Sequence, residues 1–456
     1  MACNSSGSGC QSGHCRKNDA EPPRREPVNG EGQSKPKQCS KCKVNIEVSL
    51  KTVGGGDLCG DCFRTNVYGK FRKAVTCHAM ITPSDDVLVA FSGGASSRVA
   101  LQFVHDLQRK KQMDFNASKN RALRAFDVAV VFVDERIVHP SGCGEFDEVV
   151  RDMGLIVTNL GPPVKKFHVV PIESVYGSVT DDGKEKLVNL IGAVGDETGR
   201  EDLLLHLRML ALQKVAVENG YTKIVLGSCT SRIARHILAA TVKGQGFSLS
   251  ADIQYVDARW EIPLVLPLRD CTSQELNSIC SLDGLKTVLI SESPSSSINN
   301  LISSFATLVQ EEHRSRECII VRTAGKLTPF HFNKVTEIND SNVPLATLRR
   351  LKRYNIQTKE SLSSESFCHI CNSPLKSVDL SDTNCLKSNH HSSFSSGCCS
   401  SCQFQILPKD PLAMEQFYSL LPEPILDRTR HQNHSDVSSL REQIQDFLLS
   451  DTETEL

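Results

Sequence analysis

Two pairs of cysteines near the start of the chain have the spacing of a metal site. Cys39 and Cys42 form one Cys-x2-Cys pair, Cys59 and Cys62 form another, and sixteen residues separate the pairs. Each pair puts two thiolates on one tight turn, and two such turns supply the four sulfur ligands of a tetrahedral zinc ion. The pattern therefore predicts a structural zinc ribbon. A redox dithiol is less favoured, because it needs only one pair.

A second set of cysteines lies near the end of the chain. Cys368 pairs with Cys371 and Cys399 with Cys402, across a gap of 27 residues. This spacing predicts a second structural zinc site. The fourth ligand of that site stays open, because the gap holds four further candidates: Cys385, His390, His391 and Cys398.

The stretch VLVAFSGGASSRVAL, residues 87–101, has the pattern of a strand, a glycine turn and a helix. Two glycines let the backbone approach an anion, and the helix start adds free N–H groups and a positive dipole end. The sequence therefore indicates a phosphate-binding loop, and a tight turn without a ligand is the alternative. The binding candidates are Ser92, Gly93, Gly94 and Ser97.

This loop lacks the charges that nucleotide chemistry uses. Ala95 and Ser96 follow the glycines, where a lysine and a carboxylate would handle Mg-ATP. Arg98 is expected to point away around the helix. We also expect Gly94→Val to distort the turn, because valine resists a positive φ angle.

Alternating strand and helix patterns surround the loop. Such alternation predicts βαβ units and a doubly wound, mainly parallel α/β sheet. Ligands of such sheets lie at the carboxyl ends of the strands, where the glycine loop and Gly227 fall. We expect strands at 85–91, 127–135, 165–173 and 222–228, and helices at 97–110, 144–154, 200–220 and 231–244.

The composition limits the class of protein. The 456 residues carry a formal net charge of -1, so contact with nucleic acid needs a local basic patch. We expect no export signal and no membrane span, and thus a reducing, cytoplasmic location in which the 19 cysteines are thiols or metal ligands. The expected division is a disordered tail (1–36), a zinc ribbon with a basic linker (37–80), the α/β domain (81–325) and a C-terminal region with the second cysteine set and an amphipathic helix at 435–449 (326–456).

Basic residues gather in three clusters, one of which is formed by residues 109–111 with Arg121 and Arg124. Residues 63–78 interleave cations with Phe63, Tyr68 and Phe71, a combination that suits RNA phosphates and exposed bases. Inward packing of these aromatic residues, with the cations on a solvated face, is the equal alternative. The RNA-binding candidates are Arg64, Lys70, Arg72 and Lys73 in this segment, with Arg349, Arg350, Lys352 and Arg353 farther along the chain.

Two further cysteines, Cys143 and Cys229, fall near the carboxyl ends of expected strands. They are weak catalytic candidates, because a thiol at such a place can carry a persulfide or bind a cluster. A buried free cysteine more often acts as a small hydrophobic residue.

A family resemblance is carried by the SGGASS loop, the flanking cysteine unit, VFVDE, the stretch LGSCTSRIARHILAATVKGQGFSL and IPLVLPLRD. The chain resembles the cytoplasmic tRNA 2-thiolation protein 2 family over roughly residues 39–450. The resemblance implies a degenerate PP-loop fold of the ATP-pyrophosphatase superfamily. It also implies a subunit that is not catalytic alone and that serves 2-thiolation of the wobble uridine in the Lys, Glu and Gln tRNAs of the cytosol.

The implied partners are a catalytic PP-loop thiouridylase subunit, cytosolic tRNA and a thiocarboxylated ubiquitin-like sulfur carrier. Departures from the active pattern at Ala95, Ser96 and Gly227-Ser228-Cys229-Thr230-Ser231 put ATP use by this chain in doubt. Two other functions remain: a self-sufficient ATP-dependent tRNA sulfurtransferase, and a zinc-binding interaction protein without a role in RNA.

Overall fold

A computed structural model describes residues 38–46, 49–53, 55–117, 125–138, 143–177, 181–288, 296–313, 315–333, 362, 364, 366–376 and 394–434. The tail (1–36), the cluster at 349–353 and the terminal helix expected at 435–449 lie outside these residues. Within the described ranges, none of the helices is both long and apolar enough to cross a membrane.

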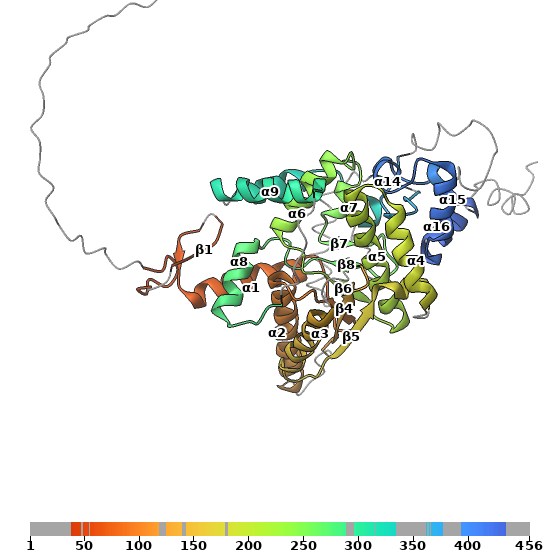
Figure 1. Ribbon diagram of the computed structural model, residues 1–456. Coiled ribbons are helices and arrows are strands. Elements are labelled where there is room, and N and C mark those ends of the chain that lie inside the picture. Colours follow the sequence, from red (N-terminus) through yellow and green to blue (C-terminus); the bar gives the residue numbers. More distant parts are fainter. Residues whose placement is uncertain are drawn as a thin grey trace, which may run out of the picture.

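A six-stranded sheet forms the centre of the molecule, in the order β5-β4-β3-β6-β8-β7. All neighbouring strands run parallel except the short pair β7 and β8. The doubly wound, mainly parallel fold predicted from the sequence is therefore confirmed (Figure 1). The strands are β3 (Asp86–Ala90), β4 (Asp127–Asp134), β5 (Lys166–Pro171), β6 (Lys223–Val225), β7 (Val256–Asp257) and β8 (Leu264–Val265).

Alternate side chains of the strands enter two different cores, because successive residues of a strand point to opposite faces. Val87 and Val89 of β3 pack on one face and Leu88 on the other. The first face is covered by α1 (Gly60–Cys77), α2 (Ala95–Ala117), α3 (Cys143–Thr158) and α8 (Ser273–Leu282). The second is covered by η2 (Ile172–Tyr176), α4 (Asp181–Ala193) and α5 (Glu197–Glu218).

The C-terminal elements belong to the second core. Cys368, Phe394, Phe417 and Ile425 are buried together with Leu207 of α5, so the apolar core runs across the boundary expected at residue 325. The elements are α14 (Ser400–Gln405), α15 (Pro411–Ser419) and α16 (Glu423–His434). A third, smaller core joins α6 (Thr230–Val242), α7 (Leu249–Asp252) and α10 (Arg316–Ala324), with α9 (Ile298–Glu312) beside α6 and η3 (His331–Asn333) near β7.

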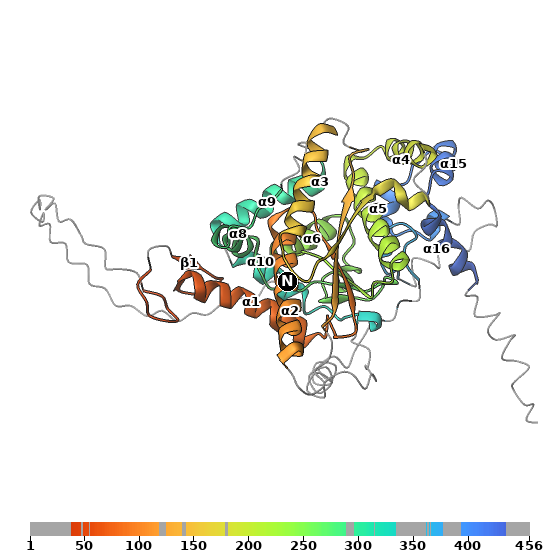
Figure 2. The same cartoon turned by 90° about the horizontal axis from the view of Figure 1, so that it is seen from below.

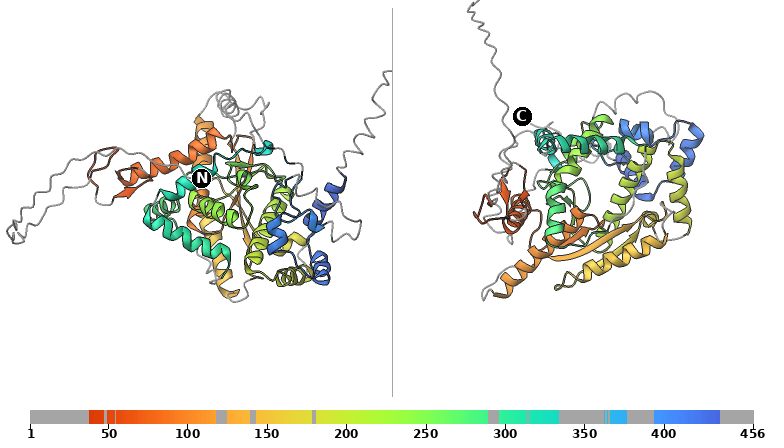
Figure 3. Two further views of the ribbon diagram at one scale, coloured as in Figure 1. Left: turned by 90° about the horizontal axis from the view of Figure 1, so that it is seen from above. Right: turned by 60° about the vertical axis from the view of Figure 1, so that its left-hand side comes forward.

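The two cysteine-rich units lie on opposite sides of the α/β body. The hairpin of β1 (Leu50–Lys51) and β2 (Asp57–Leu58) precedes α1 on one side, and α15 and α16 pack on the other (Figures 1 and 2). Two further views show the same separation (Figure 3).

Candidate metal centres and the glycine loop

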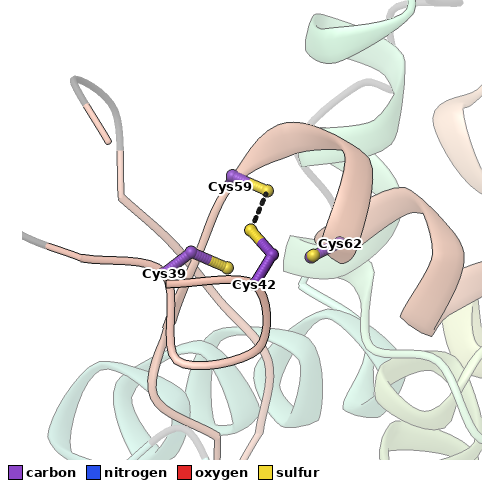
Figure 4. A group of neighbouring side chains, drawn as sticks. All are labelled: Cys39, Cys42, Cys59 and Cys62. Atoms are coloured by element: carbon purple, nitrogen blue, oxygen red, sulfur yellow. Dashed lines mark hydrogen bonds between the residues drawn. The ribbon is translucent and has the colours of Figure 1, made fainter. Parts of the chain in front are cut away.

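The four N-terminal cysteines come together, as their spacing predicts. Their sulfur atoms all lie within 4.8 Å of one another, and Figure 4 shows the side chains converging from a tight turn and from the start of α1. The Sγ atoms of Cys42 and Cys59 are 3.6 Å apart. A tetrahedron with metal–sulfur bonds of about 2.3 Å has sulfur–sulfur edges of about 3.8 Å, so a zinc-sized ion fits.

Local backbone structure sets this geometry. The N–H of Cys39 donates to Val44 O at 2.8 Å, and the N–H of Lys43 donates to Cys39 O at 2.9 Å. Lys43, directly after Cys42, has a φ of 64°, which closes the turn that carries both ligands. The second pair belongs to α1, where Cys59 is the N-cap and Cys62 lies in the first turn.

The C-terminal cysteines repeat this arrangement. The N–H of Cys368 donates to Ser373 O at 2.8 Å, and that of Asn372 donates to Cys368 O at 2.9 Å, with φ 57° at Asn372. Cys399 is the N-cap of α14, and Cys402 lies in its first turn. One structural unit, a turn followed by a helix start, therefore occurs twice in the chain.

The C-terminal group consists of Cys368, Cys371, Cys399 and Cys402, again with all sulfur atoms within 4.8 Å. The Sγ atoms of Cys371 and Cys399 are 3.6 Å apart. Cys398 stays outside the group, because its thiol donates to Phe394 O at 3.4 Å. The other three candidates in the gap, Cys385, His390 and His391, lie outside the described residues.

The thiols of each group differ in how readily they ionise. The backbone N–H groups of Cys42 and Cys59 stabilise the thiolate of Cys39 and lower its pKa to about 6. The neighbouring Cys59 thiol, together with burial, raises the pKa of Cys62 to about 12. The same split holds at the other site, where burial opposes ionisation of Cys368 but hydrogen bonds from the surrounding thiols bring its pKa well below the usual value. A divalent cation bound between the four sulfur atoms would favour ionisation of the remaining thiols.

The two groups differ in exposure. Cys42 is exposed, whereas Cys368, Cys371 and Cys402 are buried within the second core. Arg428 of α16 fixes the C-terminal turn, because its Nη1 donates to the carbonyls of His369 and Ile370 at 3.0 and 3.1 Å. The C-terminal site is thus part of the core of the α/β body.

The glycine loop is closed by its own contacts. The Ser97 hydroxyl donates to Gly94 O at 2.9 Å and lies 3.2 Å from the Ser92 hydroxyl. The N–H of Val288 donates to Gly93 O at 3.0 Å. Both serine hydroxyls that the sequence assigned to a phosphate therefore contact protein atoms.

The glycine that the turn requires is Gly93, and the expectation for Gly94 is wrong. Gly93 has a φ of 82°, and a Cβ there would meet Val288 O at 2.6 Å. Gly94 has no positive φ, and a Cβ on it would meet nothing within 4 Å. The chain turns at the first glycine, because α2 begins at Ala95 and Gly94 already accepts the hydrogen bond of Arg98.

The stretch after β6 lies directly against the start of α2. A Cβ on Gly227 would meet Ser97 Cα at 2.7 Å, so only glycine fits there. The Ser96 hydroxyl donates to Cys229 Sγ at 3.7 Å, and the hydroxyl of Ser231 donates to Glu317 at 2.5 Å. The small residues after β3 and after β6 therefore allow the ends of these two strands to pack closely.

Sequence comparison gives the family. No protein-family model matches the chain. The chain is 53% identical over 459 residues to the cytoplasmic tRNA 2-thiolation protein 2 of Arabidopsis thaliana, with 99% of each chain covered. It belongs to the cytoplasmic tRNA 2-thiolation protein 2 family. The protein of that name from Oryza sativa subsp. indica is 46% identical, with 91% of this chain and 90% of the relative covered.

Among solved structures, the U34-tRNA thiolase NcsA from Methanococcus maripaludis with its [4Fe-4S] cluster is similar at a TM-score of 0.48 and 16% identity. The match covers 64% of this chain and 87% of NcsA. An NMN synthetase from Francisella tularensis is similar at a TM-score of 0.33 and 12% identity, over 68% of this chain and all of the other.

The two isolated cysteines occupy different positions in this member of the 2-thiolation protein 2 family. Cys143 is the first residue of α3, and its side chain lies outside what the structure describes. Cys229 is 2% exposed and caps the start of α6 beside Ser96. Its burial matches the small-hydrophobe alternative, and a role in sulfur transfer stays a prediction for both.

The basic segment after the ribbon is helix α1, which sequence patterns had not indicated. Phe63 and Phe71 are fully buried, and Tyr68 packs between Phe71 and Phe103 with ring centroids 5.7 and 5.1 Å away. These three aromatic rings of α1 therefore form core contacts, as the inward-packing alternative expects.

The four cations of α1 fall into two classes. Arg64 forms an ion pair with Asp283, and Lys70 Nζ lies 2.7 Å from the buried Glu275. Glu275 also closes the capping box of α8, so these two cations join α1 to α8. Arg72 and Lys73 are exposed, and no described residue forms an ion pair with either.

Proposed function

We propose that this chain is a subunit required for 2-thiolation of the wobble uridine of cytosolic tRNAs for Lys, Glu and Gln, and that it works in the cytoplasm. The observation that carries the proposal is the 53% identity to a protein named for this modification, over 99% of both chains. The match runs along the whole length, so it includes both cysteine units as well as the α/β body.

The proposed partner is a catalytic PP-loop subunit that adenylates the uridine and takes sulfur from a thiocarboxylated ubiquitin-like carrier. Support comes from the glycine loop. Ala95 and Ser96 bring no charge to it, and Ser92 and Ser97 bond to each other and to the backbone. Adenylyl transfer needs fixed charges that offset the developing negative charge, so a partner must supply them.

Pyrophosphate release tests this division of labour. The purified chain with tRNA and ATP is expected to give no release and no thiolated uridine, and both should appear when the catalytic partner is added. The double variant Ala95→Lys, Ser96→Asp should stay inactive alone, because Gly227–Ser231 also lacks carboxylates. Robust turnover by the unassisted chain would instead establish a self-sufficient sulfurtransferase.

Both cysteine groups are proposed to hold structural zinc. Four thiolates at tetrahedral spacing, with every ligand position taken by protein, are typical of structural rather than catalytic zinc. The four-part division of the chain stays a prediction. ATP binding by the glycine loop also stays a prediction, and the uncharged Ala95 and Ser96 argue against it.

A tRNA-binding surface is proposed on the outer side of α1, at Arg72 and Lys73. Both cations are exposed and free to contact phosphates. Reversing both charges to Glu is expected to weaken tRNA binding by about tenfold at low salt and to reduce the slope of log affinity against log salt by about two.

Filter binding of tRNA over a salt series measures this effect. The matched control is the double reversal of Lys166 and Lys409, which are exposed on β5 and on the segment between α14 and α15. An unaltered slope in the Arg72, Lys73 variant would place the RNA contacts elsewhere, and a wild-type chain without salt-dependent tRNA binding would favour an interaction protein with no role in RNA.

A further inference from the structure

A cavity of about 340 Å³ lies between the start of α2, the second half of α3 and the segment after α8. None of the loop residues 92–97 lines it. Its volume is at the lower end of the range for small-molecule sites. Its polar lining residues are Arg98, Gln102, Asp152, Asn159 and Lys286.

Arg98 is the unusual member of this lining. Arg98 is only 7% exposed. Its Nε is buried and has no hydrogen-bond partner. Among the described residues, no carboxylate lies within ion-pair distance of the Arg98 guanidinium.

Within the described part of the chain, the guanidinium has one hydrogen-bond partner, and this partner is neutral. Arg98 Nη1 donates to Gln102 Oε1 at 3.1 Å, and Gln102 Nε2 in turn donates to Asp106 Oδ1 at 3.0 Å. Asp106 is therefore reached only through an amide. Burial lowers the pKa of Arg98, and the charges of Cys280 and Asp106 offset this shift only in part.

The rest of the lining leaves this charge unbalanced. Lys286 Nζ and Asp152 Oδ2 form an ion pair at 2.8 Å and cancel each other. Arg98 then leaves the cavity with one net positive charge. A buried cation without a partner costs free energy, and a bound anion removes that cost.

We propose that this cavity is a binding site for an oxyanion group, a carboxylate or a phosphate, with the Arg98 guanidinium as its main ligand. The planar fork of a guanidinium matches two oxygens of either group. Asn159 and Lys286 offer further donors, and Leu155, Ile156 and Leu160 form an apolar wall for the remainder of the ligand. The proposal does not rest on tRNA thiolation.

Calorimetric titration of the full-length, zinc-loaded chain tests the site, with inorganic phosphate and acetate as probes and sodium chloride at equal ionic strength as the reference. At least one oxyanion is expected to bind and to raise Tm beyond the effect of chloride. Phosphate alone would indicate a phosphorylated ligand, and acetate alone a carboxylate. No binding of either probe above chloride overturns the proposal.

Two variants on one helix assign the ligand. Arg98→Met should weaken binding of the active probe about 10- to 100-fold, as expected for hydrogen bonds to a charged group. It should not lower Tm without the probe, because it removes an unpaired buried charge. Arg109→Met, an exposed arginine on α2, should bind as the wild type does.

Full binding by Arg98→Met would overturn the assignment. If that variant does not fold, Arg98→Lys is the substitute, with affinity expected between the two because a lysine keeps the charge and loses the fork. These readouts use neither tRNA nor a catalytic partner, so their failure and that of the proposed function are separate results.

Discussion

A chain with Cys368→Ser and Cys371→Ser is expected to carry one zinc ion fewer than the wild type and to lose the folded structure of its C-terminal region. The site is buried in the second core, so loss of the ion leaves the thiols of Cys399 and Cys402 and two new hydroxyls without partners in an apolar surrounding. Structural zinc contributes about 10 kcal/mol or more in small zinc domains, which is comparable with the whole stability of a typical protein.

Zinc content by mass spectrometry and Tm by calorimetry measure the outcome. The paired variant Cys39→Ser, Cys42→Ser should also lose about one zinc but with a smaller fall in Tm, because its site is more exposed and lies at the edge of the first core. Cys398→Ser is the matched control and should keep its zinc, since its sulfur bonds to Phe394 O. Unchanged zinc in the Cys368, Cys371 variant would refute the metal assignment.

Gly93→Ala is expected to lower the free energy of unfolding by about 2 kcal/mol or more, whereas Gly94→Ala should change it by less than about 0.5 kcal/mol. An alanine at Gly93 must adopt a left-handed conformation, which alone costs about 1 kcal/mol. Its Cβ also meets Val288 O at 2.6 Å, so a backbone segment must move. Neither cost exists at Gly94.

Urea denaturation of the two single variants measures this difference. Both changes add one methyl group, and they do so at adjacent residues of the same loop, so each variant is a matched control for the other. Equal losses of stability in the two variants would mean that the turn is not built on Gly93.

The predictable part of the fold is the part with a strong local pattern. Strands β3, β4 and β5 are apolar runs bounded by polar residues, and α2, α3 and α5 follow them with helical periodicity, as α6 follows β6. The cysteine pairs were equally readable, because ligand spacing is a local property of the turn and of the helix start. The pairing of Cys-x2-Cys units across 27 residues needed no knowledge of the segment between them.

The remaining features depend on contacts between distant residues. The cations of α1 look like a nucleic-acid pattern until Asp283 and Glu275, more than 200 positions away, are placed beside Arg64 and Lys70. Gly93 and Gly94 are indistinguishable as letters, and only the position of Val288 shows which one has no room for a side chain. Likewise, the sequence does not show that Arg98 lacks an ion-pair partner among the described residues, because this depends on where α3 and the segment after α8 lie.

The shared second core has a consequence for how the chain is made. Leu88 and Leu207 belong to the same buried core as Phe417 and Ile425, and the Tyr176 hydroxyl donates to Leu420 O at 2.8 Å. During synthesis the part of α5 that packs against α14 therefore remains uncovered until the ribosome has released the C-terminal elements. A chain stopped after residue 325 would expose that surface permanently, so premature termination should yield an aggregating product that chaperones retain, and not a shorter working domain.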